Sequence, residues 1–172
     1  MRALLLALAA FAFGAPALAG DGPMAQMNFF QGCWHGAFTG STTVTDDRCF
    51  EPMLGGTYIR DTHQVRGAPG PYGGESVYYL DAEAHKLAVI YFSSDGGVER
   101  GFAEPDGRGG LSFPPGTYVG ADGSTLTLRA SWVTDGPDRY VATSEMLENG
   151  QWKPHLRITY TRAHDLTPPV RP

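Results

Sequence analysis

Short segments suited to β-strands, separated by turn residues, recur along nearly the whole chain. Turn sequences such as Ser94-Asp95-Gly96-Gly97 and Asn149-Gly150 return at intervals of about 8–12 residues. Between the turns, no long stretch shows the 3.6-residue period of an amphipathic helix. The sequence therefore predicts an all-β protein of about ten short strands joined by consecutive antiparallel hairpins.

A chain of consecutive hairpins can form either a closed barrel or a two-sheet sandwich. Closure into a barrel pairs the first strand with the last and removes the exposed edges on which other chains could pair. We therefore expect a single antiparallel up-and-down barrel over residues 20–163. The proline-rich residues 164–172 are expected to form a flexible tail.

The first 19 residues have the three-part pattern of a secretory signal peptide. Arg2 precedes an apolar run over residues 4–11, and Ala17-Leu18-Ala19 is a small-x-small cleavage site. The run is too short for a transmembrane helix, so no membrane insertion is expected after the signal is removed. The sequence predicts a periplasmic or secreted protein.

The acidic balance of the chain restricts its partners. The chain has 13 Lys and Arg residues and 18 Asp and Glu residues, which gives a formal net charge of −5. Nucleic acids and anionic lipid surfaces are normally bound by a basic face. The composition therefore argues against both as partners.

The two cysteines define the first hairpin. A turn centred on Ser41 places Cys33 directly opposite Cys49. Opposed residues in antiparallel strands come within about 4.5 Å at non-hydrogen-bonded positions, close to the Cα separation of a disulfide. Export to an oxidising compartment favours a cross-strand disulfide, and two unrelated buried thiols are the alternative.

Side-chain alternation assigns residues to the two faces of the barrel. If Trp34 points inward, the cysteine pair points outward and the second strand turns its even-numbered residues inward. The same alternation applies to the segments 124–134 and 152–162. The expected lining of the interior is Phe38, Asp46, Arg48, Phe50, Trp132, Ile158 and Tyr160. A ligand cavity and a core filled by side chains are both compatible with this set.

Asp46 and Arg48 are the charged members of the inward set, and buried charges are rare unless they are paired. One interpretation is a recognition site for a polar-headed ligand, in which Arg48 meets an anionic head. An ion pair between the two residues would account for Arg48 equally well. A third interpretation is that the strand bends after Thr45 and both side chains reach solvent.

Gly32-Cys33-Trp34 near the start of the first strand, with Arg162 at the end of the last, resembles the calycin superfamily. That superfamily includes lipocalins, fatty-acid-binding proteins and small exported bacterial lipocalin-like domains of unknown function. The resemblance implies that Trp34 closes one end of the barrel and that Arg162 packs over its ring. It also implies binding of a small hydrophobic or amphipathic molecule without a cofactor.

A second resemblance concerns Pro154-His155-Leu156, which is similar to the last strand of nitrobindin-type haem proteins. There, a histidine in this context ligates the haem iron. The resemblance implies haem b at His155, and a peroxynitrite isomerase or scavenger of reactive nitrogen species. Strict alternation along the strand instead places His155 on the polar face, away from Leu156.

The sequence contains no recognisable catalytic or metal-binding set. Gly-x-Ser-x-Gly, phosphate-binding and His-Glu-x-x-His motifs are absent, and the histidines lack metal-ligand spacing. Asp61 and His63 lie close in sequence but form no recognised catalytic pair. Three hypotheses result: an exported ligand-binding barrel, a haem protein, and a structural envelope domain with a filled core.

Overall fold

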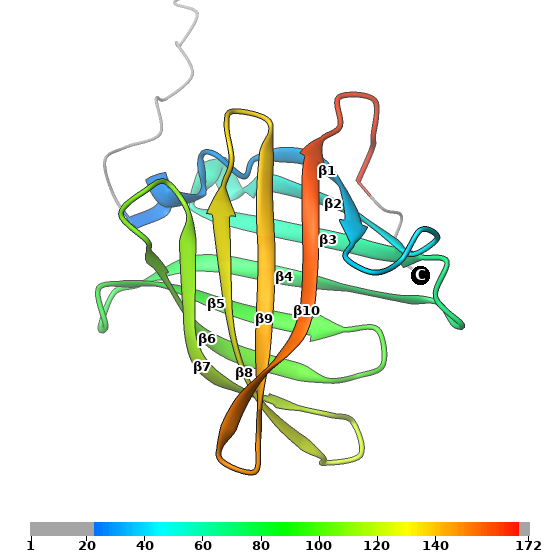
Figure 1. Ribbon diagram of the computed structural model, residues 1–172. Coiled ribbons are helices and arrows are strands. Elements are labelled where there is room, and N and C mark those ends of the chain that lie inside the picture. The colour runs from blue at the N-terminus through cyan, green and yellow to red at the C-terminus, as the bar shows by residue number, and fades with distance from the viewer. Residues whose placement is uncertain (1–22, 169–172) are drawn as a thin grey trace, which may run out of the picture.

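The computed structural model describes residues 23–168, which form a closed barrel of ten antiparallel strands (Figure 1). The strands are β1 (Gly32–Phe38), β2 (Thr45–Met53), β3 (Tyr58–Arg66), β4 (Tyr72–Asp81), β5 (Lys86–Ser93), β6 (Val98–Pro105), β7 (Leu111–Val119), β8 (Thr125–Thr134), β9 (Arg139–Glu148) and β10 (Gln151–Arg162). Two short 3-10 helices are η1 (Pro23–Met27) and η2 (Leu54–Gly56).

Each strand pairs with its neighbours in sequence, and β10 closes the barrel on β1. The predicted all-β, up-and-down architecture is therefore confirmed. The predicted signal peptide at residues 1–19 and the last four residues of the predicted tail lie outside the described residues. Among the described residues, no helix has the length and apolar character needed to span a membrane.

The β1–β2 hairpin has the register predicted from the cysteine spacing. Cys33 lies opposite Cys49, and the two form a disulfide with their Cα atoms 4.0 Å apart. This register also places Gly36 opposite Asp46. Because side chains alternate between faces, the disulfide and Asp46 lie on opposite faces of β2, and Asp46 points into the barrel.

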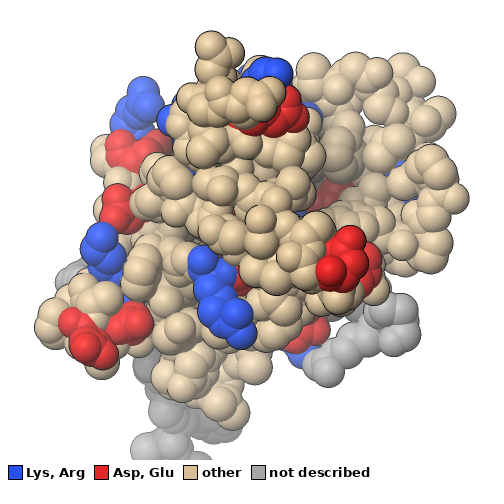
Figure 2. All heavy atoms as spheres, turned by 90° about the horizontal axis from the view of Figure 1, so that it is seen from below, with Lys and Arg blue, Asp and Glu red and all other residues tan. Residues whose placement is uncertain are grey.

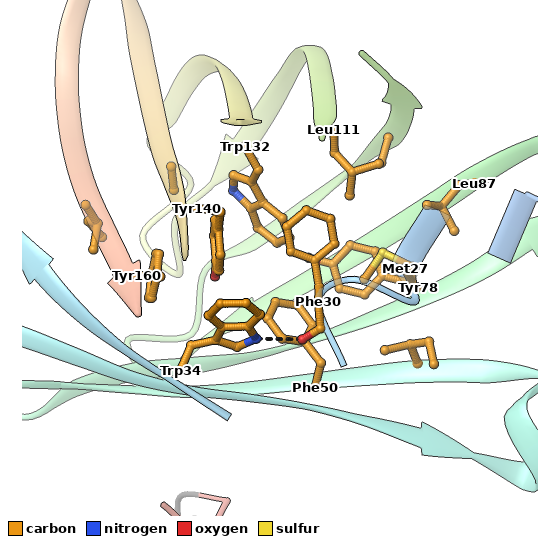
Figure 3. Packing of buried hydrophobic residues seen from close by; sticks show 14 residues of the cluster. Met27, Phe30, Trp34, Phe50, Tyr78, Leu87, Leu111, Trp132, Tyr140 and Tyr160 are labelled. Atoms are coloured by element: carbon orange, nitrogen blue, oxygen red, sulfur yellow. Dashed lines mark hydrogen bonds between the residues drawn. The ribbon is translucent and has the colours of Figure 1, made fainter. Parts of the chain in front are cut away.

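One end of the barrel is closed by residues 23–31, which comprise η1 and the turn that follows it and are called the plug below. Met27, Phe30 and Trp34 are fully buried, and the Trp34 indole Nε1 donates a 2.6 Å hydrogen bond to the Phe30 carbonyl oxygen (Figure 3). The Arg162 guanidinium lies over the Trp34 ring, 4.1 Å from its centroid. Arg162 also donates hydrogen bonds to the carbonyl oxygens of Gln31 and Phe29, at 2.8 and 2.9 Å. It thereby holds the plug segment onto β10.

An aromatic cluster continues the plug toward the middle of the barrel. Trp132 contacts Phe30 and Phe50 at ring-centroid distances of 5.1 and 5.7 Å, and Tyr140 stacks on Tyr160 at 4.6 Å. Figure 3 shows these rings converging from β2, β8, β9 and β10 on the plug. The core therefore fills the closed end, and the opposite end is left for a cavity.

Two proline-containing segments interrupt the regular ladder. The β7–β8 register shifts between Phe113 and Gly116, and the β9–β10 register shifts between Pro154 and Leu156. Proline has no N–H to donate to a neighbouring strand, so strands commonly bulge where it occurs. Both irregularities lie near the open end, where they change which side chains face inward.

Replacement of Trp34 tests the importance of the closed end. Trp34→Ala should lower the free energy of unfolding by about 3–5 kcal/mol, because it leaves a cavity and removes the ring under Arg162. Trp152→Ala is the matched control, since Trp152 is only partly buried and contacts the half-exposed Arg129. Equal urea-denaturation midpoints for the two variants would contradict this account.

Candidate ligand-binding cavity

A cavity of about 610 Å³ occupies the end of the barrel opposite the plug. Its wall is built from the end of each odd-numbered strand and the beginning of each even-numbered strand, which meet at this end because neighbouring strands run antiparallel. Much of the wall is apolar and includes Val44, Val65, Val89, Leu126 and Leu128. The interior is therefore not filled throughout, contrary to the filled-core hypothesis.

Six of the seven predicted lining residues reach this cavity. They are Phe38, Asp46, Arg48, Trp132, Ile158 and Tyr160. Phe50 points inward as expected but does not line the cavity, because it is buried between the rings of Phe30 and Trp132 at the closed end. Alternation correctly predicts the face of Phe50 but carries no information on its depth along the barrel axis.

Asp46 and Arg48 lie inside the barrel, so the interpretation that strand two bends them into solvent is wrong. Their side chains are 1% and 14% exposed, and Arg48 Nε is 3.5 Å from Asp46 Oδ2. Arg48 Nη1 is 3.4 Å from Oδ2 of a second buried carboxylate, Asp61. The guanidinium also lies over the rings of Trp132 and Tyr160, at 5.6 and 5.5 Å.

Asp46 is the centre of a hydrogen-bond network that reaches the mouth of the cavity. The Tyr160 hydroxyl donates to Asp46 Oδ2 at 2.5 Å, and His63 Nδ1 lies 3.0 Å from Asp46 Oδ1. His63 Nε2 lies 3.1 Å from the Tyr91 hydroxyl, which in turn is 3.1 Å from that of Tyr72. The network connects a fully buried carboxylate to a half-exposed tyrosine.

Gly36 makes the Tyr160–Asp46 contact possible. It pairs with Asp46 on one side and with Tyr160 on the other. A Cβ at this position would lie 2.5 Å from the Tyr160 ring. The ring therefore crosses β1 at an inward position without a side chain, and its hydroxyl reaches the next strand.

The pKa values of the two aspartates shift in opposite directions, although burial raises both. Burial alone would raise the pKa of Asp46, but the hydrogen bond with His63, the Arg48 charge and the Tyr160 hydroxyl together lower it to about 2. The pKa of Asp61 is raised, because burial outweighs the attraction of Arg48 and the 3.4 Å hydrogen bond from Ser76. The surroundings of Asp46 therefore favour its charged form beside Arg48, whereas burial disfavours the charged form of Asp61.

Sequence reasoning missed Asp61 and His63 as members of this site. β2 and β3 pair so that Arg48 lies opposite His63 and Phe50 lies opposite Asp61. The turn at Gly55-Gly56 was visible in the sequence and would have predicted this pairing. The same alternation that placed Arg48 inside would then have placed both residues beside it.

His155 is exposed, and it lies at the open end of the barrel, on a bulge of β10. The register shift between Pro154 and Leu156 breaks the alternation, and His155 lines the cavity at its open end together with Leu156. The residue is solvent-exposed, and its ring makes no hydrogen bond or ion pair within the part of the chain that the structure describes. Residues 23–168 contain no cluster of His, Cys, Asp and Glu side chains able to hold a metal ion.

Charged groups outside the cavity are dispersed. Seen from the side that carries the β9–β10 hairpin, the acidic and basic side chains form separate small groups on a largely uncharged surface (Figure 2). This face shows no basic patch of the kind that binds nucleic acid.

Comparison with known proteins supports the fold but does not assign a family. No family model matches the chain, and no curated protein matches its sequence. The crystal structure of Rv2717c from M. tuberculosis is similar, with a TM-score of 0.55 and 19% sequence identity. The similarity covers 83% of this chain and 98% of that chain. It shows a shared barrel fold, in general agreement with a calycin-like architecture.

Removal of the Arg48 charge should destabilise the protein. Arg48→Met leaves Asp46 buried without its cation, which should cost about 3–5 kcal/mol in the free energy of unfolding. Arg139→Met is the matched control, because Arg139 forms an exposed ion pair with Asp135 and should contribute at most about 1 kcal/mol. If Arg48→Met unfolded at the wild-type urea concentration, the ion-pair interpretation would be wrong.

Replacement of Asp61 should change how stability depends on pH. A carboxyl group whose pKa is raised by folding stabilises the folded protein, and this contribution is fully present below the ordinary pKa of 3.8. It is lost as the pH rises through the pKa of the group in the folded protein. The amide of Asp61→Asn does not titrate. The free energy of unfolding of this variant should therefore improve relative to wild type between about pH 4 and pH 8. Urea titrations across this range measure the difference, and a constant difference would argue against a raised pKa.

Proposed function

We propose that this barrel binds a small hydrophobic or amphipathic molecule in its open cavity, as the resemblance to calycins implies. The observation that carries the proposal is the 610 Å³ cavity, which lies within the range of about 300–1,000 Å³ typical of small-molecule sites. Its apolar wall would bury a hydrocarbon or ring system. Polar groups from β2 to β6 would contact the polar part of the ligand.

We further propose that the protein acts in the periplasm or outside the cell. Disulfides persist in oxidising compartments, and the Cys33–Cys49 bond points to such an environment. A secretory signal over residues 1–19 would deliver the chain there. An exported barrel of this kind would store, carry or sequester its ligand.

Ligand binding can be tested by native mass spectrometry of protein purified from the periplasm, followed by calorimetric titration with decanol. We expect saturable binding of one molecule per barrel. Leu128→Trp fills the cavity wall and should weaken binding at least about tenfold, whereas Leu147→Trp on the exposed surface should leave it unchanged. Absence of binding by any amphiphile would remove the proposal.

A second candidate function is haem binding, which the position of His155 favours. An imidazole without a protein partner, beside apolar residues at the cavity mouth, fits the requirements of an axial haem ligand. Leu156 and the neighbouring apolar wall would pack against the macrocycle. When bound, haem would supply the iron chemistry of an isomerase or scavenger of reactive nitrogen species.

The same purified protein distinguishes the two functions. A Soret absorption band after haem titration, lost in His155→Ala and retained in His164→Ala, would support the haem function. His164 is a suitable control because it is exposed and does not line the cavity. A saturable decanol site without a Soret band would favour the first function instead.

A further inference from the structure

We propose that the cavity selects amphipathic molecules with a cationic ammonium group, and that Glu99 is the side chain that binds this group. The inference rests on the proposed ligand-binding function and adds the chemical class of the ligand. It depends on which charged groups of the cavity wall already have partners within the protein.

Glu99 lies on the inner wall of β6, at the level of the cavity. Its neighbours across the ladder are Tyr91 on β5 and Tyr118 on β7, and all three residues line the cavity. Its carboxylate lies against Gly116, where a Cβ would be 3.1 Å from Oε1. Gly116 follows the proline bulge of β7, so the bulge and the missing side chain together make room for the carboxylate.

Glu99 has no partner among the residues that the structure describes: it forms no hydrogen bond or ion pair with any of them. Burial raises the pKa of this side chain, and no neighbouring group opposes the effect. The other acids of the cavity wall differ. Asp46 is held by Tyr160, His63 and Arg48, and Asp95 accepts hydrogen bonds from the Tyr118 hydroxyl and the Gly97 N–H.

The arginines that line the cavity already have partners. Arg48 contacts Asp46 and Asp61, and Arg129 Nε lies 2.6 Å from Glu145 while its guanidinium stacks on Trp152 at 4.4 Å. A ligand carboxylate would therefore have to compete with an existing ion pair. A ligand ammonium would find one carboxylate whose desolvation no protein cation offsets.

Desolvation explains why a ligand ammonium group should bind in this cavity more tightly than a ligand carboxylate. A partly buried carboxylate without a partner loses hydration and gains nothing in return. An ammonium group that enters with an apolar tail restores the missing charge partner and forms charge-assisted hydrogen bonds. We therefore assign the ligand to the class of amphipathic amines, and not to fatty acids.

The test compares decylamine, decanol and decanoate by calorimetric titration of the disulfide-bonded protein. The three probes share one tail and differ in the charge of the head. We expect wild type to bind decylamine at least about tenfold more tightly than either of the others, as one charge-assisted hydrogen bond implies. Glu99→Gln should reduce decylamine affinity to that of decanol and leave decanol binding unchanged.

Glu104→Gln is the matched control. It removes the same charge from the same strand, but Glu104 does not line the cavity and pairs with the half-exposed Lys86 at 2.8 Å. Its preference for decylamine should equal that of wild type. Because the three probes are also compared on wild type alone, the preference can be measured even if Glu99→Gln fails to fold.

The outcomes separate the two proposals. Decanol binding without a preference for decylamine would overturn the assignment of an amine ligand and leave the ligand-binding function intact. A preference that persists in Glu99→Gln would overturn the role of Glu99. No binding of any of the three probes would overturn the ligand-binding function, and this inference with it.

Discussion

Closure of β10 on β1 is the constraint on which the rest of the structure depends. Trp34 pairs with Arg48 on one side and with Arg162 on the other, so a single residue sets the inward face of three strands. The disulfide holds the β1–β2 register, and the contacts of Arg162 hold the plug to β10. A shift by one residue in the β1–β2 pairing would turn Asp46 outward, and the same shift in the β1–β10 pairing would turn Tyr160 outward.

Once the inward face of these strands is set, the barrel must accommodate charged residues in its interior. The cost of burying Asp46 and Arg48 is offset by mutual attraction, by the Tyr160 hydroxyl and by the ring of His63. This network lies between the packed aromatic end and the open cavity. It lies beside the rings of Trp132 and Tyr160, and it forms the polar side of the cavity.

The two ends of the barrel thus have different roles. The closed end resembles an ordinary protein interior, in which Phe30, Phe50 and Trp132 contact one another closely. The open end contains the irregular backbone, an unpartnered histidine and an unpartnered carboxylate. Strain and unsatisfied groups are commonly found at functional sites, because a bound ligand can supply the missing interactions. His155 and Glu99 both line the cavity, which agrees with the binding function proposed above.

Much of the architecture follows from local sequence signals. Regular turns predicted the hairpins, and closure followed from the need to pair the edge strands. The spacing of Cys33 and Cys49 predicted one register, and alternation then placed Asp46, Arg48 and Tyr160 inside. These features depend on residues close in sequence, or on a period of two that every strand shares.

Other features were decided by the tertiary structure. The burial of Phe50 at the closed end and the presence of a cavity depend on how side chains from all ten strands share one volume. His155 faces the cavity because a bulge at Pro154 breaks the alternation that was applied to it. Glu99 carried no signal in the sequence, since a glutamate on a strand ordinarily faces water. Its missing partner becomes visible only when the neighbouring strands are in place, because hydrogen bonds and ion pairs of a buried group are formed across the barrel and not along the chain.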